Sequence, residues 1–154
     1  MKTQLFSMVV VVAAVIFLSA CASLSGINVP FGSVASSHGG EVEDQVGLLD
    51  ALRATGAEVE VGDEVEQPFF SVKGQVVKVN GMDVQFFEYE SAEAMEADAA
   101  QVAPDGSSIG TSMVAWIDAP HFFKQGRVLV LYVGSDEAML NQLEEVLGGQ
   151  FAGK

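Results

Sequence analysis

Side chains that act as bases or nucleophiles near neutral pH are scarce in this chain of 154 residues, which has one cysteine and two histidines. His121 follows Asp118 at a spacing that would let the carboxylate orient the imidazole as a general base. No serine stands in an S-x-x-K pattern, one of the usual settings of a serine nucleophile. Because no nucleophile accompanies His121 and aromatic residues follow it directly, we expect it to have a packing or turn role.

Metal and cofactor sites also lack their usual patterns. A structural zinc site needs three or four cysteines and histidines, and the second histidine, His38, lies in a stretch rich in serine and glycine. The carboxylates at 61–67 and 88–98 are dense but do not follow the spacing of a calcium loop, so we interpret them as solvated acidic faces. The segment at 104–112, PDGSSIGTS, lacks the G-K-[ST] of a phosphate-binding loop, which favours a surface turn. The sequence therefore predicts no metal and no bound cofactor.

Aromatic residues give the strongest indication of a binding surface, because adjacent pairs occur at 69–70, 86–87 and 122–123, in or beside predicted strands. Neighbouring residues of a strand point to opposite faces, so only one ring of each pair can enter a core on one side of a sheet. If helices cover only that side, the other face would present an aromatic patch, which usually marks a binding site. The alternative is that the chain ends or a long loop cover that face. The residues of the predicted binding face are Phe70, Phe87, Tyr89, Trp116 and Phe123.

The chain is strongly acidic, with 21 aspartates and glutamates against 7 lysines and arginines and a formal net charge of −14 at pH 7. Proteins bind nucleic acids through lysines and arginines that displace counterions from the phosphates. The charge therefore argues against nucleic-acid binding, and it also argues against attraction to anionic lipid surfaces. We otherwise interpret it as serving solubility.

The N-terminal residues have the order of a secretory signal peptide. Lys2 provides a short positive region, residues 8–18 form an apolar run, and two small residues then precede Cys21. The apolar run is short for a membrane span, which needs about 20 residues. We therefore predict that residues 1–20 are a signal peptide.

The sequence LSAC at 18–21, formed by Leu18, Ser19, Ala20 and Cys21, resembles the lipobox of bacterial lipoproteins at all four positions. In that family the signal peptide is cleaved just before the cysteine, whose thiol receives a diacylglycerol and whose new N-terminus often receives a further acyl chain such as palmitate. The resemblance implies the same for Cys21. Two or three acyl chains hold a protein at a membrane almost permanently, whereas one chain binds only reversibly. The alternatives are an ordinary secretory signal with one stray cysteine and a plain membrane anchor.

Three regions follow from these observations: a signal peptide at 1–20, a lipidated cysteine with a flexible tether at 21–40, and a globular domain at 41–154. The tether is rich in serine and glycine, and its mean reach would be about 25 Å. In the lipoprotein family, an aspartate after the cysteine tends to retain the protein at the inner membrane. Ala22 and Ser23 are not that signal, so the resemblance implies the outer membrane in a bacterium with two membranes, and otherwise the outer face of the cytoplasmic membrane.

The globular part alternates between helical and strand patterns. Apolar residues recur at helical spacing in 42–55, and again after Ser91 and Ser135, each of which is placed to cap a helix. The order α-β-β-β-α-β-β-α predicts an α+β fold, with a mostly antiparallel sheet of four or five strands and helices packed on one face. Strand patterns occur at 57–65, 75–79, 82–89, 111–117, 122–123 and 127–133.

The pair Asn80-Gly81 predicts a type I′ hairpin turn, which would place Lys78 opposite Asp83. The stretches 80–102 and 125–147 share the order turn, strand, serine, "EAM" and helix, which indicates a tandem hairpin–helix repeat. Gene duplication and local convergence are both open as its origin.

The tracts at 65–89 and 104–134 look like a group of small bacterial envelope lipoproteins. The resemblance spans most of 43–151 and implies no activity, ligand or site. Our leading hypothesis is a non-enzymatic, lipid-anchored domain that binds an envelope protein or an apolar small ligand through the aromatic face. The alternatives are an envelope hydrolase that uses acidic residues and a passive structural or stress-related surface protein.

Overall fold

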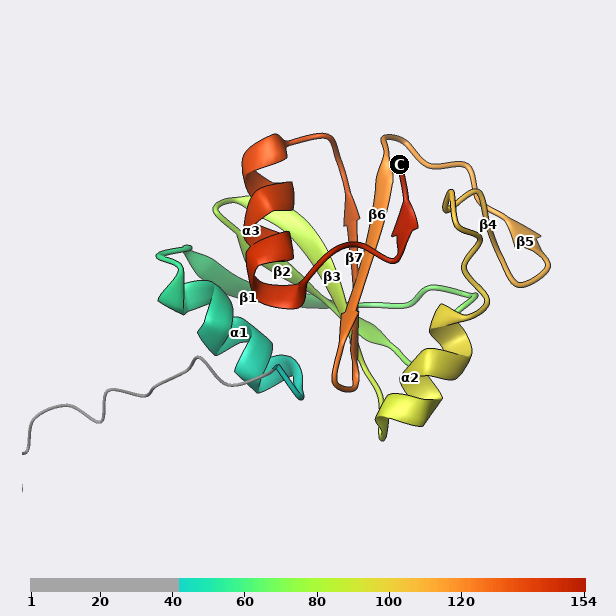
Figure 1. Cartoon of the computed structure of the whole chain (residues 1–154), viewed down its shortest axis with the longest axis horizontal. Helices are drawn as coiled ribbons and strands as arrows, with labels where there is room; N and C mark the ends of the chain where they lie inside the picture. The colour runs from blue at the N-terminus through green and yellow to red at the C-terminus, as the bar shows by residue number, and fades with distance from the viewer. Residues whose placement is uncertain (1–41) are drawn as a thin grey trace, which may run out of the picture. The chain divides into compact units, whose positions relative to one another are not determined.

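The computed structural model describes residues 42–154, and the predictions for the signal peptide, Cys21 and the tether lie outside this range (Figure 1). Helices and an antiparallel sheet make the described chain an α+β fold, as predicted, and the main elements follow the predicted order. The elements are α1 (Gln45–Ala54), β1 (Val59–Val65), β2 (Gly74–Val79), β3 (Met82–Glu88), α2 (Ala92–Ala99), β4 (Ser108–Ile109), β5 (Ser112–Met113), β6 (Pro120–Gln125), β7 (Val128–Val133), α3 (Glu137–Leu147) and β8 (Ala152–Gly153).

The main sheet has six strands in the order β1-β2-β3-β7-β6-β8, and every neighbouring pair is antiparallel. The predicted number of four or five is corrected to six, because the two-residue strand β8, which the sequence did not predict, joins the sheet. Strand β8 pairs with His121 and Phe122 of β6. The strand predicted at 111–117 lies outside this sheet, since only Ser112–Met113 forms a strand, and it pairs with β4 alone.

The β2–β3 hairpin has the predicted register, with Lys78 opposite Asp83. Asn80 has φ 51° and Gly81 has φ 83°, the left-handed conformations that a type I′ turn requires at both of its central residues. The Lys78 Nζ lies 2.6 Å from Asp83 Oδ1, so an ion pair also links the two strands. The Asn-Gly pair therefore determined this register locally.

Helices cover both faces of the sheet, which corrects the prediction of a single covered face (Figure 1). Helices α1 and α3 pack on one face, whereas α2 and the chain around the β4–β5 hairpin pack on the other. Strand β7 shows why. Val128 and Val130 enter the core under α1 and α3, and Leu129 and Leu131 enter the core under α2. Because both faces of this strand are apolar, a single helical layer could not bury it.

Each helix begins at a side chain that accepts a hydrogen bond from the backbone N–H three residues later, and these caps are Asp44, Ser91 and Asp136. Ser91 is the predicted cap of α2. The predicted cap of the last helix, Ser135, is corrected to Asp136. The Ser135 hydroxyl instead donates to Asp118 Oδ1 at 2.8 Å, which ties the segment before β6 to the start of α3.

Candidate functional site

The predicted aromatic binding face is not open to solvent, which corrects that prediction. The side chains of Phe87 and Phe123 are 0% exposed, and Tyr89 and Phe70 are also buried. Phe123 lies in the core under α1 and α3, whereas the other residues lie in or against the core under α2, so the five residues do not share one face. The cover on that side comes from helix α2, which neither interpretation expected, and from the chain around the β4–β5 hairpin and the C-terminal residues Phe151 and Ala152, as the alternative interpretation expected. Trp116 differs from the other four in being half-buried.

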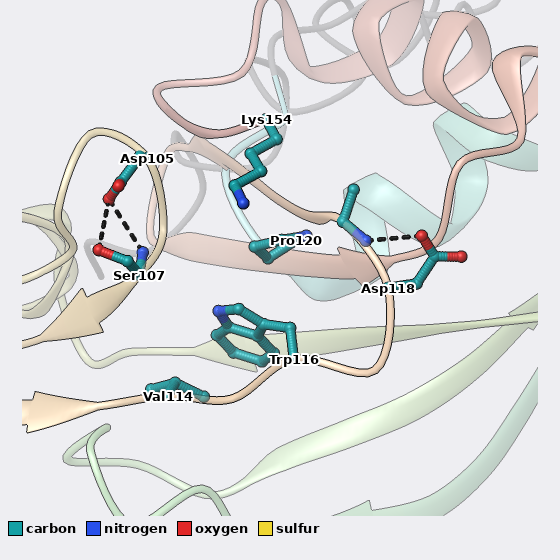
Figure 2. A pocket seen from close by; sticks show the side chains of 8 residues that line it. Asp105, Ser107, Val114, Trp116, Asp118, Pro120 and Lys154 are labelled. Carbon is teal, nitrogen blue, oxygen red and sulfur yellow. Dashed lines mark hydrogen bonds between the residues drawn. The ribbon is translucent and has the colours of Figure 1, made fainter.

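Trp116 lines a cavity of about 340 Å³ between the segment that follows α2 and the start of β6 (Figure 2). We call it the Trp116 cavity. Its volume lies at the lower end of the range for small-ligand sites. Its lining residues are Asp105, Ser107, Val114, Trp116, Asp118, Ala119, Pro120 and Lys154.

The Trp116 ring is fixed by the segment before β4. Its indole Nε1 donates a hydrogen bond to the Gly106 carbonyl oxygen at 2.7 Å. The ring meets Phe69 and Phe122 edge-on, with centroids 6.2 and 5.9 Å away. Gly106 has φ +68°, and a Cβ atom there would lie 2.9 Å from the Pro120 side chain, so this close approach requires glycine. Trp116 therefore forms a rigid aromatic wall.

Two lining carboxylates are held by local hydrogen bonds. Asp105 Oδ1 accepts from the backbone N and the hydroxyl of Ser107 at 3.0 and 2.7 Å. Asp118 Oδ1 accepts from the Ala119 backbone N at 2.7 Å and from the Ser135 hydroxyl at 2.8 Å. The Ser107 hydroxyl chiefly lowers the pKa of Asp105, and the Ser135 hydroxyl chiefly lowers that of Asp118. Both groups are therefore ionised at neutral pH.

Lys154 brings one positive charge to the Trp116 cavity. Its side chain reaches in from the side opposite Trp116 (Figure 2). Its backbone N donates to the Pro120 carbonyl at 3.1 Å, and the preceding Gly153 N donates to the Pro104 carbonyl at 3.0 Å. Among residues 42–154, every other lysine and arginine forms an ion pair within 4.0 Å, whereas Lys154 forms none. The cavity therefore combines two negative side chains with one positive side chain.

Two apolar side chains next to the lining residues are almost fully exposed. Met113 is 90% exposed and Ile117 is 99% exposed. Met113 directly precedes Val114, and Ile117 directly follows Trp116. Successive residues of an extended chain point to opposite sides. Val114 and Trp116 therefore face the cavity, whereas Met113 and Ile117 face solvent. We take the segment 112–118 as a candidate contact surface.

His121 lies outside the lining of this cavity. Its side chain is 4% exposed, its ring stacks against Tyr132 with centroids 6.1 Å apart, and its Nδ1 lies 2.6 Å from Gln150 Oε1. Its Nε2 is buried without a hydrogen-bond partner among the described residues. Asp118 bonds to other groups and not to this imidazole, so the orienting pair of a general base is not formed. These contacts support a packing role for His121.

A buried carboxylate that the sequence patterns did not single out attaches α2 to neighbouring segments. Asp98 is 7% exposed and accepts hydrogen bonds from the backbone N and hydroxyl of Ser71, the Tyr89 hydroxyl and the Gln101 amide, at 2.7 to 3.1 Å. Burial and the bond to Asp98 raise the pKa of Tyr89 well above its usual range. The signal in the sequence is that Asp98 falls three residues after Met95, on the apolar side of the helix.

Sequence reasoning identified Trp116 but missed most of the polar lining. It interpreted 104–112 as a surface turn, although this segment contains Asp105 and Ser107. The usable signal was the Asp-x-Ser spacing, since an aspartate often accepts from the backbone N–H two residues later and so orders a turn. The position of Lys154 in the cavity could not be predicted from the sequence, because it depends on the pairing of β8 with β6, which are far apart in the sequence.

No protein-family model, no curated protein and no solved structure matches this chain. Within residues 42–154, no helix has the length and apolar character needed to cross a membrane. In the same part of the chain, no group of three or more His, Cys, Asp or Glu side chains is placed to hold a metal ion. The function is therefore inferred from the cavity and from the N-terminal sequence.

Proposed function

We propose that this chain is a bacterial lipoprotein, anchored in the cell envelope through Cys21, whose folded part binds a partner protein and is not an enzyme. The match of LSAC at 18–21 to a lipobox and the apolar run at 8–18 support the anchor. The residues after Cys21 favour the outer membrane where the bacterium has two membranes. Binding takes place on the segment 112–118 and the Trp116 cavity, rather than on the buried sheet face.

The observation that carries the binding function is the exposure of Met113 and Ile117 beside a preformed cavity. Apolar surface in water is unfavourable, at roughly 25 cal/mol for each Å² that a contact could cover. A partner that covers both side chains would recover this free energy. The rigid Trp116 ring and the two fixed carboxylates next to them would add specificity without further ordering.

The hydrolase alternative receives less support from the same cavity. A glycosidase-like mechanism needs one carboxyl group that stays protonated at neutral pH, which requires a raised pKa. Hydrogen bonds lower the pKa of both Asp105 and Asp118. Neither group is therefore suited to act as the general acid, and the two carboxylates are better suited to hold a ligand by charge.

Site-specific photo-crosslinking in the native bacterium would test the binding surface. A crosslinking amino acid at Ile117 is expected to give a discrete adduct with a partner protein, and Met113→Ser in the same chain should reduce its yield. The matched control is the same crosslinker at Val46, an apolar residue on α1 that is 66% exposed. Adducts of equal yield at both positions, or none at Ile117, would contradict the proposal.

The anchor needs a separate test. Wild-type protein is expected in the membrane fraction, and its intact mass should correspond to the chain from Cys21 with added acyl groups. The Cys21→Ser variant should lose this modification. An unmodified thiol on a chain that keeps residues 1–20 would show that the lipoprotein assignment is wrong.

A further inference from the structure

We propose that the Trp116 cavity receives the cationic end of an arginine or lysine side chain of the partner protein, an inference that depends on the proposed binding function. Three observations support it: carboxylate oxygens that lack donors, an aromatic wall, and exposed apolar side chains in the same segment.

Each lining carboxylate uses only one of its oxygens. Asp105 and Asp118 accept through Oδ1, and Oδ2 of each has no hydrogen-bond donor among the described residues. Their side chains lie toward opposite ends of the cavity lining, with Trp116 between them in this view (Figure 2). A guanidinium group offers five N–H donors and an ammonium group three, and charge-assisted bonds to carboxylates are among the stronger hydrogen bonds. Since serine hydroxyls and backbone N–H groups already fix both carboxylates, a ligand would not have to order them.

The aromatic wall suits the rest of such a side chain. The indole N–H of Trp116 is already occupied by the Gly106 carbonyl, so the ring offers apolar and π contacts and no free donor. Arginine and lysine carry methylene stems that pack on apolar surfaces, and their cationic ends are attracted to aromatic faces. A volume of about 340 Å³ also fits one long side chain better than a large ligand.

The charges around the cavity select for a cation. The two aspartates outnumber Lys154, and the whole chain has a formal net charge of −14, so an anionic ligand would be repelled. Lys154 already places an ammonium group in the cavity without an ion pair within 4.0 Å. It therefore competes with a guest cation, and its removal should strengthen binding.

The segment 112–118 indicates that the cation belongs to a protein. Met113 and Ile117 face solvent on the other side of the segment whose Trp116 lines the cavity. A free amine or polyamine could occupy the cavity but could not cover these side chains. An arginine or lysine flanked by apolar residues could contact both the cavity and the segment.

Tryptophan fluorescence provides a direct test, because Trp116 is the only tryptophan of the chain. The purified lipoprotein in detergent would be titrated with blocked peptides of the sequence Leu-Arg-Leu, Leu-citrulline-Leu and Leu-Glu-Leu, and with free spermidine. We expect the arginine peptide to change the fluorescence at the lowest concentration. Citrulline has nearly the same shape without the charge, so it isolates the contribution of the cation.

Charge variants of the lining make the test specific. Asp105→Asn and Asp118→Asn should each weaken binding of the arginine peptide by about two- to fivefold, because asparagine keeps the Oδ1 acceptor but loses the charge. Lys154→Gln should strengthen binding by a similar factor. The control Asp83→Asn changes a carboxylate that is paired with Lys78 and lies outside the lining, and it should leave the affinity unchanged.

Equal binding of the arginine and citrulline peptides, or a Lys154→Gln effect in the same direction as Asp105→Asn, would overturn the inference. Spermidine binding as tight as that of the arginine peptide would overturn the assignment to a partner side chain. If crosslinks at Ile117 persist while no cationic probe binds, the proposed function stands and only this inference fails. If the crosslinks are also absent, both fail.

Discussion

At the scale of single residues, Asp98 is notable because its carboxylate is buried and accepts four hydrogen bonds. It lies on α2, and its buried carboxylate accepts from Ser71, Tyr89 and Gln101. No lysine or arginine neutralises it within 4.0 Å in the described residues, so these donors alone compensate for its burial. These hydrogen bonds therefore help to attach α2 to the domain, beside the apolar contacts of Met95 and Ala99 in the core.

Removal of this carboxylate should destabilise the domain. Asp98→Ala would leave the buried Tyr89 hydroxyl without its acceptor, and we expect the free energy of unfolding to fall by about 2 kcal/mol in urea denaturation. Asp83→Ala is the matched control, because it removes an exposed carboxylate with one ion pair and should cost less than about 1 kcal/mol. Similar losses in the two variants would show that the Asp98 contacts do not hold α2.

The raised pKa of Tyr89 predicts a loss of stability in alkali. In the unfolded chain this hydroxyl ionises near pH 10, whereas burial and the bond to Asp98 keep it protonated in the folded chain. Its contribution is therefore fully present below about pH 10 and declines as the pH rises further, because the unfolded state then binds fewer protons. Urea denaturation between about pH 8 and about pH 11 should show a smaller alkaline loss for Tyr89→Phe than for wild type. Parallel curves for the two proteins would contradict this assignment.

At the scale of elements, the features predicted best were those whose information is local. The β2–β3 register followed from Asn80-Gly81, and the cap of α2 followed from Ser91. The apolar run at 127–133 correctly predicted a strand, β7, whose residues 128–132 are all buried. The sequence of a helix, however, does not determine on which face of the sheet the helix packs. The prediction that all helices pack on one face was wrong for this reason.

The candidate site was predicted incompletely for the same reason, because local sequence patterns do not determine contacts between distant segments. The alternation at 111–117 resembles a strand, but whether such a segment joins the sheet depends on partners elsewhere in the chain. Here Trp116 bonds to Gly106, and the segment lines a cavity instead. Phe87 was assigned to an open face because its cover, formed by α2 and the chain around the β4–β5 hairpin, could not be predicted from the strands. Phe123 was assigned to the same face, although it lies in the core under α1 and α3.

The turn between β6 and β7 supports the chain before α1, and its glycine can be tested. Gly126 has φ +57°, and a Cβ atom there would lie 2.5 Å from the backbone of Glu43, whose carbonyl accepts from Arg127 N at 2.9 Å. Gly126→Ala should therefore combine a conformational cost of about 1 kcal/mol with a clash of about 1–3 kcal/mol. Gly56→Ala also has a positive φ but meets nothing within 4 Å, so it should show the first cost alone. Equal shifts of the two variants in thermal denaturation would argue against the contact with Glu43.

At the scale of the whole molecule, the negative charge is spread over the domain. Six ion pairs engage every lysine and arginine of residues 42–154 except Lys154, and many exposed carboxylates lie outside these pairs. Edge strand β1 exposes Glu60, Asp63 and Glu64 and has an irregular register between Val61 and Glu64, features that discourage pairing with another chain. The same charge opposes the compact state, because like charges repel one another more strongly when the chain is folded.

Self-repulsion of this size predicts that salt stabilises the folded domain. Raising NaCl from about 20 mM to about 300 mM shortens the screening length to below 10 Å, and we expect the Tm to rise by about 4 °C. A variant with Glu90→Gln and Glu145→Gln should show a smaller rise, because these exposed carboxylates belong to no ion pair among the described residues. Its Tm at low salt should also exceed that of the wild type. An equal rise in Tm for both proteins would mean that salt acts through exclusion from the protein surface rather than through screening. Repulsion among the carboxylates would then not limit the stability of the fold.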